Sequence, residues 1–201
     1  MTEQQTPEHE LGYTAHESAY IDTPCHIGHG TRIWHFCHVM AGARIGAGCT
    51  LGQNVYVDRD AVIGDGCKLQ NNVSIYKGVV LQDRVFCGPS VVFTNVINPR
   101  AFIERKHEFR PTVVQEGATL GANSTIVCGI TIGAYALIGA GSVVTKDIPA
   151  HALIYGVPAR QMGWVCCCGT TLTVEPESKG CRCPSCQSRY RVEAGRLRAL
   201  S

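Results

Sequence analysis

Hydrophobic residues recur along this chain with a strict period of six. The positions of the first register are all apolar: Ile21, Ile27, Ile33, Val39, Ile45, Leu51, Val57, Ile63, Leu69, Ile75, Leu81 and Cys87. Four residues after each of them stands a small or β-branched residue: Cys25, Thr31, Cys37, Ala43, Cys49, Val55, Ala61, Cys67, Val73, Val79, Val85 and Val91. After one interruption both registers resume and continue from Val114 to Ile148. A period of six is too short for a helical repeat, and helical spacing would scatter these residues over more than one face.

A triangular coil explains the period. Each hexapeptide is then one short strand plus a corner, with the large aliphatic side chain inside a prism and the smaller residue near the bend. Glycines such as Gly46, Gly64 and Gly133 supply permissive backbone at the corners. Three hexapeptides make one turn, so the repeats predict about six coils and a prism roughly 29 Å long at the spacing of a β-sheet. The predicted fold class is all-β.

Composition agrees with one main domain. At 201 residues and 45% hydrophobic content, the chain can bury one sizeable core and carry a small appendage. The formal charge of +2 and the absence of a long basic run predict no nucleic-acid partner. Residues 1–20 form a polar segment without an apolar stretch, and none follows later, so we expect a cytoplasmic protein with no membrane partner.

Twelve cysteines need an explanation in such a compartment, where buried thiols or metal ligands are more common than disulfides. Five of them fall on the core registers and are expected to pack as small hydrophobes: Cys25, Cys37, Cys49, Cys67 and Cys87. Cys128 lies off both registers and receives no assignment.

The repeat breaks once, over residues 94–113. A solenoid does not need an insertion in order to stack, and loops that leave a rigid repeat commonly carry binding or chemistry. This loop is rich in side chains that recognise phosphates and carboxylates: Asn95, Asn98, Arg100, Glu104, Arg105, Lys106, His107 and Arg110. It is therefore the predicted functional site of the β-helix domain, which we assign to residues 21–163. The alternative is a solvated loop.

The character of the chain changes at Trp164. Within residues 164–201, Cys166 and Cys168 form one pair and Cys183 and Cys186 another, separated by the strand-like segment TTLTV. Four thiolates in two such knuckles predict a closed, structural zinc site in a small ribbon-like tail, which has too few apolar residues to fold without metal. Cys167 and Cys181 are extra, so which two of Cys166, Cys167 and Cys168 bind stays open. The alternative is a set of unligated thiols.

The repeated motif [LIV]-G-x-x-x-x resembles that of the hexapeptide acyltransferases. A longer match, from Arg32 to Trp164, is similar to the UDP-2-acetamido-3-amino-2,3-dideoxy-D-glucuronate N-acetyltransferases of bacterial surface-polysaccharide synthesis. It runs through RIWHFCHV, GQNVYV, LQNNVSIY, VFCGPSVVFTNVINPR, IERK, GATLGANSTIVCG and GVPARQMGW. The resemblance implies a left-handed parallel β-helix, a homotrimer, and acetyl-CoA bound between neighbouring prisms as the cosubstrate.

The reaction implied by the resemblance is attack of a sugar C3 amine on the thioester of acetyl-CoA, giving an amide and free CoA. Asn95 would orient the amine, and Arg105 and Arg100 would hold the uronate carboxylate or the diphosphate. Further substrate contacts are expected at His35, Asn72 and Asn98. The coenzyme contacts are expected at Lys146 and Arg160 for its phosphates, Pro158 for its adenine end, and Gly121 and Ala140 for its pantetheine arm. Many members of this family use a histidine as base, and His35, His38, His107 and His151 are the candidates, none singled out by its position.

Three other functions stay open. The substrate could be a different nucleotide-linked amino sugar, such as a dTDP-3-amino or UDP-4-amino sugar. A γ-type carbonic anhydrase shares the fold but needs three histidines converging on zinc, whereas here the histidines gather mainly in the early repeats and in the loop. A non-catalytic β-helix in a larger assembly would lack acetyl-CoA binding.

Overall fold

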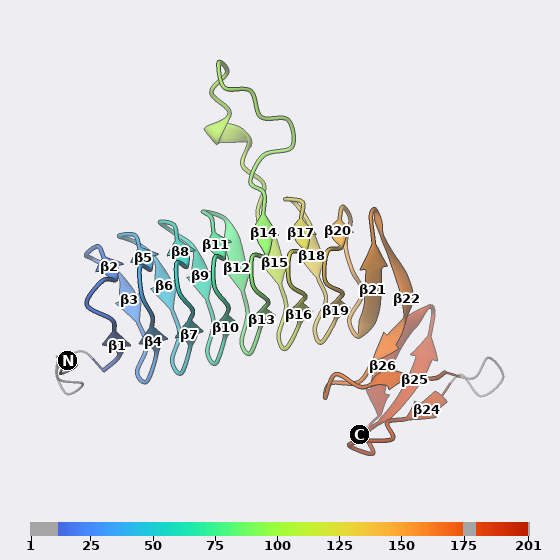
Figure 1. Cartoon of the computed structure of the whole chain (residues 1–201). Helices are drawn as coiled ribbons and strands as arrows, with labels where there is room; N and C mark the ends of the chain where they lie inside the picture. The colour runs from blue at the N-terminus through green and yellow to red at the C-terminus, as the bar shows by residue number, and fades with distance from the viewer. Residues whose placement is uncertain (1–11, 175–179, 201) are drawn as a thin grey trace.

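The computed structural model describes residues 12–174 and 180–200, and in them the chain forms the predicted left-handed parallel β-helix (Figure 1). Short strands succeed one another on three faces of a prism. Face 1 holds β1 (Thr14–Ala15), β4 (Arg32–Ile33), β7 (Thr50–Leu51), β10 (Lys68–Leu69), β13 (Phe86–Cys87), β16 (Thr119–Leu120), β19 (Leu137–Ile138) and β21 (Ala152–Gly156). Face 2 holds β2 (Tyr20–Ile21), β5 (His38–Val39), β8 (Tyr56–Val57), β11 (Ser74–Ile75), β14 (Val92–Phe93), β17 (Thr125–Ile126) and β20 (Val143–Val144). Face 3 holds β3 (His26–Ile27), β6 (Arg44–Ile45), β9 (Val62–Ile63), β12 (Val79–Leu81), β15 (Thr112–Val114) and β18 (Thr131–Ile132).

The second residue of each two-residue strand points into the prism, because successive side chains in a strand alternate between faces. Val39, Leu51 and Leu69 are completely buried, whereas the residue before each of them is partly or fully exposed. Stacked strands pair in parallel, with Leu69 beside Leu51 and Cys87 beside Leu120. The register inferred from the period of six is therefore confirmed.

Four of the five cysteines assigned to the core are buried as predicted: Cys37, Cys49, Cys67 and Cys87. Several of these thiols also donate to a corner carbonyl of the next coil, such as Cys67 Sγ to Gln82 O at 3.1 Å. Burial raises the pKa of Cys87 to about 12, so this thiol stays neutral. Cys25 is only half-buried, since it lies in the first of the described coils. Cys128, which had no assignment, is buried where the interrupting loop begins, and its N–H donates to Thr94 Oγ1 at 2.9 Å.

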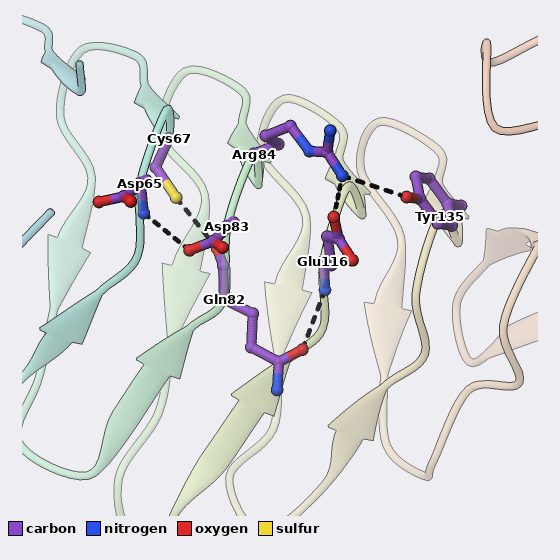
Figure 2. Close-up of polar contacts among 7 residues, drawn as sticks. All are labelled: Asp65, Cys67, Gln82, Asp83, Arg84, Glu116 and Tyr135. Carbon is purple, nitrogen blue, oxygen red and sulfur yellow. Dashed lines mark hydrogen bonds and ion pairs between the residues drawn. The ribbon is translucent and has the colours of Figure 1, made fainter. Parts of the chain in front are cut away.

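Polar side chains stack along the edge between faces 3 and 1 (Figure 2). Asp83 Oδ1 accepts the N–H of Asp65 at 2.8 Å, and Gln82 Oε1 accepts the N–H of Glu116 at 3.2 Å. Arg84 forms an ion pair with Glu116 and lies 3.4 Å from the hydroxyl of Tyr135. Since Arg84 and Glu116 stand on opposite sides of the interruption in sequence, the coils before and after the loop stack without a break.

The prism is longer than the repeat pattern indicates at both ends. β1 lies inside the segment expected to be a polar extension, yet it pairs with β4 as a full rung of face 1. At the other end β21 pairs with β19 and turns into the antiparallel β22 (Ala159–Val165), which crosses the expected boundary between residues 163 and 164. Ala15 and Ala19 continue both registers six residues before Ile21 and Cys25, so β1 extends the period with small residues, whereas β21 departs from the period and only its pairing reveals it. The part of the expected extension from residue 1 to 11 lies outside the described residues.

The tail is a small separate layer joined to the last coil. β22 pairs with β23 (Thr171–Leu172), and a second sheet follows with β24 (Gly180–Arg182), β25 (Arg189–Glu193) and β26 (Arg196–Leu200). Its own core holds Cys166, Leu172, Cys183, Tyr190 and Leu197. Trp164 packs against both this core and that of the prism. No helix in the described residues is long and apolar enough to cross a bilayer.

Gly121 shows how closely the coils stack. A Cβ atom at this position would lie 2.5 Å from the backbone nitrogen of Ala140 in the next coil. Gly121→Ala is therefore expected to destabilise the protein by about 2–3 kcal/mol, measured by urea unfolding, because the backbone must shift to relieve the overlap. The matched control is Gly48→Asn. Gly48 has φ +65° with open space around it, and asparagines occupy the same left-handed conformation at Asn54 and Asn72, so we expect a change within about 0.5 kcal/mol. Equal effects of the two changes would contradict the steric explanation.

Candidate functional site

The interrupting loop projects from the edge between faces 2 and 3, where it leaves β14 and returns to β15 (Figure 1). Its two ends are held together, because the N–H of Arg110 donates to Asn95 O at 3.0 Å. A single 3₁₀ turn, η1 (Lys106–Glu108), interrupts the loop. The loop is thus tied at its base and extends beyond the prism.

Asn95 lies at the entrance of the loop and is half-buried. Its backbone carbonyl holds the base of the loop, and its side-chain amide makes no hydrogen bond with any described residue. An amide offers one acceptor oxygen and two N–H donors, so this side chain is available to a ligand at the end of face 2.

Arg105 is the most enclosed cation of the loop, with its side chain 23% exposed. One terminal nitrogen pairs with Glu108 at 2.7 Å, while its Nε is buried and has no hydrogen-bond partner among the described residues. A buried, unpaired guanidinium N–H costs free energy, which an anionic ligand would recover. Arg100 and Asn98 are exposed, and Arg100 donates only to the carbonyl of Pro99, its neighbour, at 2.9 Å.

The residues expected to contact the coenzyme flank the last rungs of face 2. Gly121 and Ala140 lie in stacked corners between faces 1 and 2, and Lys146 is exposed at the corner on the other side of β20. Pro158 and Arg160 belong to the β21–β22 hairpin, whose Gly156 N–H donates to Ser142 Oγ at 3.2 Å in the same row of corners as Ala140. Coil stacking by itself explains the glycine at position 121, so its identity does not indicate a ligand.

The other substrate candidates lie farther from the loop. His35 stacks on His16 with ring centroids 3.5 Å apart, at a corner three coils, or about 14 Å, before the coil that carries the loop. Asn72 adopts φ +62° at the corner one coil before the loop, where it accepts a hydrogen bond from Asn54 at 3.0 Å. It has a structural role there, although its side chain remains exposed. A single chain does not bring His35 and Asn95 together.

None of the candidate histidine bases contacts Asn95 among the described residues. His38 lies on the early part of face 2, paired with Asp22 at 3.0 Å, and His107 is exposed beside Glu108 at 3.6 Å. His151 is buried against the tail.

One row of side chains escaped the sequence interpretation. Tyr20, His38 and Tyr56 follow one another along face 2 with ring centroids 6.1 and 5.7 Å apart. They are spaced by 18 residues, one full coil, so a comparison at that spacing would have found them. This row makes the early part of face 2 aromatic, whereas its later part is aliphatic and small.

The four cysteines predicted to bind metal meet in the tail. The sulfur atoms of Cys166, Cys168, Cys183 and Cys186 all lie within 4.8 Å of one another, with 3.3 Å between Cys166 and Cys186 and 3.6 Å between Cys168 and Cys183. Sulfurs around zinc at about 2.3 Å would stand about 3.8 Å apart, so the donor set fits a tetrahedral site. Hydrogen bonding from the backbone N–H of Cys186 lowers the pKa of Cys183 to about 6, whereas burial raises the pKa of Cys166 to about 12. Of the first three cysteines, Cys166 and Cys168 are the two whose sulfur atoms belong to this group.

Aromatic contacts join this cluster to the prism. His151 stacks on Tyr135 with centroids 5.2 Å apart and meets the ring of Tyr190 at the same distance. The Tyr190 hydroxyl lies 3.1 Å from Cys166 Sγ and accepts the N–H of Cys167 at 3.0 Å. His151 Nδ1 lies 3.0 Å from the carbonyl oxygen of Val165, so its N–H donates there. His151 therefore has a structural position between the last coil and the tail.

The burial of His151 makes the stability of the fold depend on pH. Desolvation by burial lowers its pKa below the ordinary value of about 6.5. The unfolded chain therefore binds the proton more readily than the folded one, so this contribution to stability is complete above about pH 6.5 and is lost as the pH falls. We expect His151→Gln to reduce the loss of urea stability between pH 8 and pH 5.5, relative to the exposed control His26→Gln. An identical pH dependence in both variants would show that folding does not lower the pKa of His151.

The repeat matches known protein families, and the chain has a relative of similar length. The family described as bacterial transferase hexapeptide (six repeats) matches residues 24–59 and 111–146, and the hexapeptide repeat of succinyl-transferase matches residues 42–77. The dTDP-3-amino-3,6-dideoxy-alpha-D-galactopyranose 3-N-acetyltransferase of Aneurinibacillus thermoaerophilus is 44% identical over 180 residues, 90% of this chain and 91% of that protein. A match of that length spans the repeats on both sides of the interrupting loop.

Other similarities are shorter or concern the fold. The bifunctional protein GlmU of Thermotoga petrophila is 50% identical over 58 residues, which are 27% of this chain and 13% of that one. Among solved structures, WeeI from Acinetobacter baumannii AYE aligns with a TM-score of 0.51 and 21% identity, over 74% of this chain and 57% of that chain. The latter likeness supports the architecture alone.

Proposed function

Since the chain belongs to the hexapeptide-repeat sugar N-acetyltransferases, we propose that it moves an acetyl group from acetyl-CoA to the C3 amine of a nucleotide-linked 3-amino sugar. The observation that carries the proposal is the 44% identity to that relative over 180 residues, 90% of this chain and 91% of that protein. A non-catalytic β-helix would have no need for this loop, with its unpaired Asn95 amide and the partnerless Nε of Arg105.

In the proposed reaction the neutral amine attacks the thioester carbon, the C–N bond forms, and the C–S bond breaks. The side-chain oxygen of Asn95 accepts one N–H of the amine and directs the nitrogen lone pair at the carbonyl carbon. An amide is not a useful base at neutral pH, so the proton leaves to the departing CoA thiolate, directly or through water. Most of the acceleration then comes from holding the two reactants in contact.

Two observations favour two different candidate substrates. The relative from Aneurinibacillus acts on a dTDP-linked sugar, which makes a dTDP-3-amino-hexose the first candidate. The buried, partnerless Nε of Arg105 favours a UDP-linked 3-amino-uronic acid as the second, because a uronate adds a carboxylate that this guanidinium could bind. The uronate would place the enzyme in the synthesis of bacterial surface polysaccharide.

We propose a homotrimer and a cytoplasmic location as parts of the same function. His35 and Asn72 lie on coils that precede the loop in one chain, and packing of a neighbouring prism against face 2 would bring them to the loop of that neighbour. Lys146, Pro158 and Arg160 would then bind the nucleotide end of CoA, with its pantetheine arm along Gly121 and Ala140. A structural Zn²⁺ held by Cys166, Cys168, Cys183 and Cys186 completes the proposal.

A substrate panel tests the function. The protein is incubated with acetyl-CoA and dTDP- or UDP-linked 3-amino and 4-amino sugars, and thiol release is followed. We expect turnover with a 3-amino sugar, and the preferred nucleotide distinguishes the two candidates. Turnover confined to 4-amino sugars would refute the position of transfer, and failure to bind acetyl-CoA at all would favour an assembly subunit.

A further inference from the structure

The three-stranded sheet of the tail presents an arginine-rich face. Residues paired across an antiparallel sheet share a face. Arg189 pairs with Arg182, Arg191 with Arg198, and Glu193 with Arg196. All five arginines are exposed, whereas Tyr190 and Leu197, which point to the opposite face, are buried in the tail core with Cys166. The arginines therefore point away from the cysteine cluster.

The net positive charge of the protein comes from the segment that forms this face. Residues 180–200 contain five arginines and one acidic residue, Glu193, a net charge of +4. The complete chain carries only +2, so the remainder is net negative by two charges. The balanced total, from which no polyanionic partner was expected, conceals a strongly basic surface on one small sheet.

The arrangement is unfavourable for the isolated tail. Like charges directly opposite each other destabilise a sheet, and this face contains two such pairs, Arg182 with Arg189 and Arg191 with Arg198. The one ion pair on this face among the described residues joins Arg198 to Glu193 at 3.8 Å. Arg182 Nε donates to Gln187 O at 3.4 Å, and none of the four arginines other than Arg198 forms an ion pair with a described residue, so an anionic partner would neutralise them.

We infer that this arginine face docks the protein on an anionic phospholipid surface. A three-stranded sheet offers a flat face, and clusters of four to eight basic residues are typical of peripheral binding to anionic headgroups. The exposed Leu200 pairs with Arg189 and so adds an apolar side chain to the same face. Single-stranded nucleic acids are bound by aromatic side chains that stack on bases, and the described residues of this face include no aromatic one.

Vesicle binding by the full-length protein tests the inference independently of acetyl transfer. With vesicles of phosphatidylcholine containing about one third phosphatidylglycerol, we expect the protein to co-sediment at low salt, and to be released at about 0.5 M NaCl. The double change Arg189→Gln and Arg191→Gln is expected to weaken the partition coefficient about 25-fold, since each arginine contributes roughly fivefold. Turnover in solution should not change, which shows that the variant is folded.

The matched control removes two exposed arginines from the prism, Arg32→Gln and Arg44→Gln, and should bind vesicles like the unchanged protein. Equal weakening by both double variants would overturn the inference, because net charge and not this face would then be responsible. Binding to a DNA duplex but not to the vesicles would identify a nucleic acid as the partner instead. Binding to neither DNA nor vesicles would show that the face is only solvated. Either of these two results would overturn the inference.

Discussion

Cys183→Ser is expected to abolish stoichiometric zinc binding and to unfold the tail, while the prism keeps its structure. Cys183 is fully buried and supplies one of the four sulfurs of the cluster. Zinc contributes about 10–16 kcal/mol to folding in small structural sites, far more than the few apolar side chains of this tail can replace. Metal analysis would measure the loss of zinc, and limited proteolysis would detect the opened segment from residue 164 to 200.

Cys167→Ser is the control, because Cys167 is an exposed neighbour whose sulfur lies outside the cluster. It should retain zinc and resist proteolysis. Zinc that remains stoichiometric without Cys183, or that is lost with Cys167, would refute the assignment of the ligands. Because His151 and Tyr190 join the cluster to the last coil, loss of zinc should also weaken binding of acetyl-CoA through the β21–β22 hairpin, with a higher KM and little change in kcat.

Asn95→Ala is expected to lower kcat/KM about 100-fold, the loss typical when a reacting group is misplaced by about 1 Å. The fold should not change, because the hydrogen bond that closes the base of the loop uses the backbone carbonyl of Asn95 and not its side chain. If the amide orients the amine and accepts no proton, the pH profile of the variant should keep its shape while the rate falls at every pH. Steady-state kinetics across pH would measure both effects.

Glu104→Gln provides the control within the same loop, since Glu104 is exposed and its contact with Lys106 is 3.5 Å long. It should retain nearly full activity. An unchanged rate in Asn95→Ala would remove this residue from the mechanism, and a shifted pH profile would show that the proton transfer depends on it.

Much of the candidate site could be located from the residues alone. The interruption from residue 94 to 113 stands out against a strict repeat, and the loop it predicts is present with Asn95 at its entrance. The four cysteines of the tail were likewise chosen by spacing, and the structure brings their sulfur atoms together. Short-range spacing was sufficient in both cases, because each pattern is local.

Other features depend on contacts between distant residues. His35 carries no sign in the sequence that it stacks on His16 at the far end of the prism from the tail. Gly121 needs to be a glycine because of the backbone of the next coil, a contact that lies 19 residues away in the sequence. The basic face of the tail was hidden in a nearly neutral total charge and appears only when the pairing of β24, β25 and β26 places its arginines on one side.

The sequence by itself determined the β-helix, its core register and the position of its single break, because an aliphatic residue at every sixth position has only one way to stay buried. Only the tertiary structure decided where the coil ends, how the coils stack across the loop, and how His151 and Tyr190 join the tail to the prism. Those contacts join residues that are far apart in the sequence. Their distances depend on how the coils and the tail pack, which no local pattern encodes.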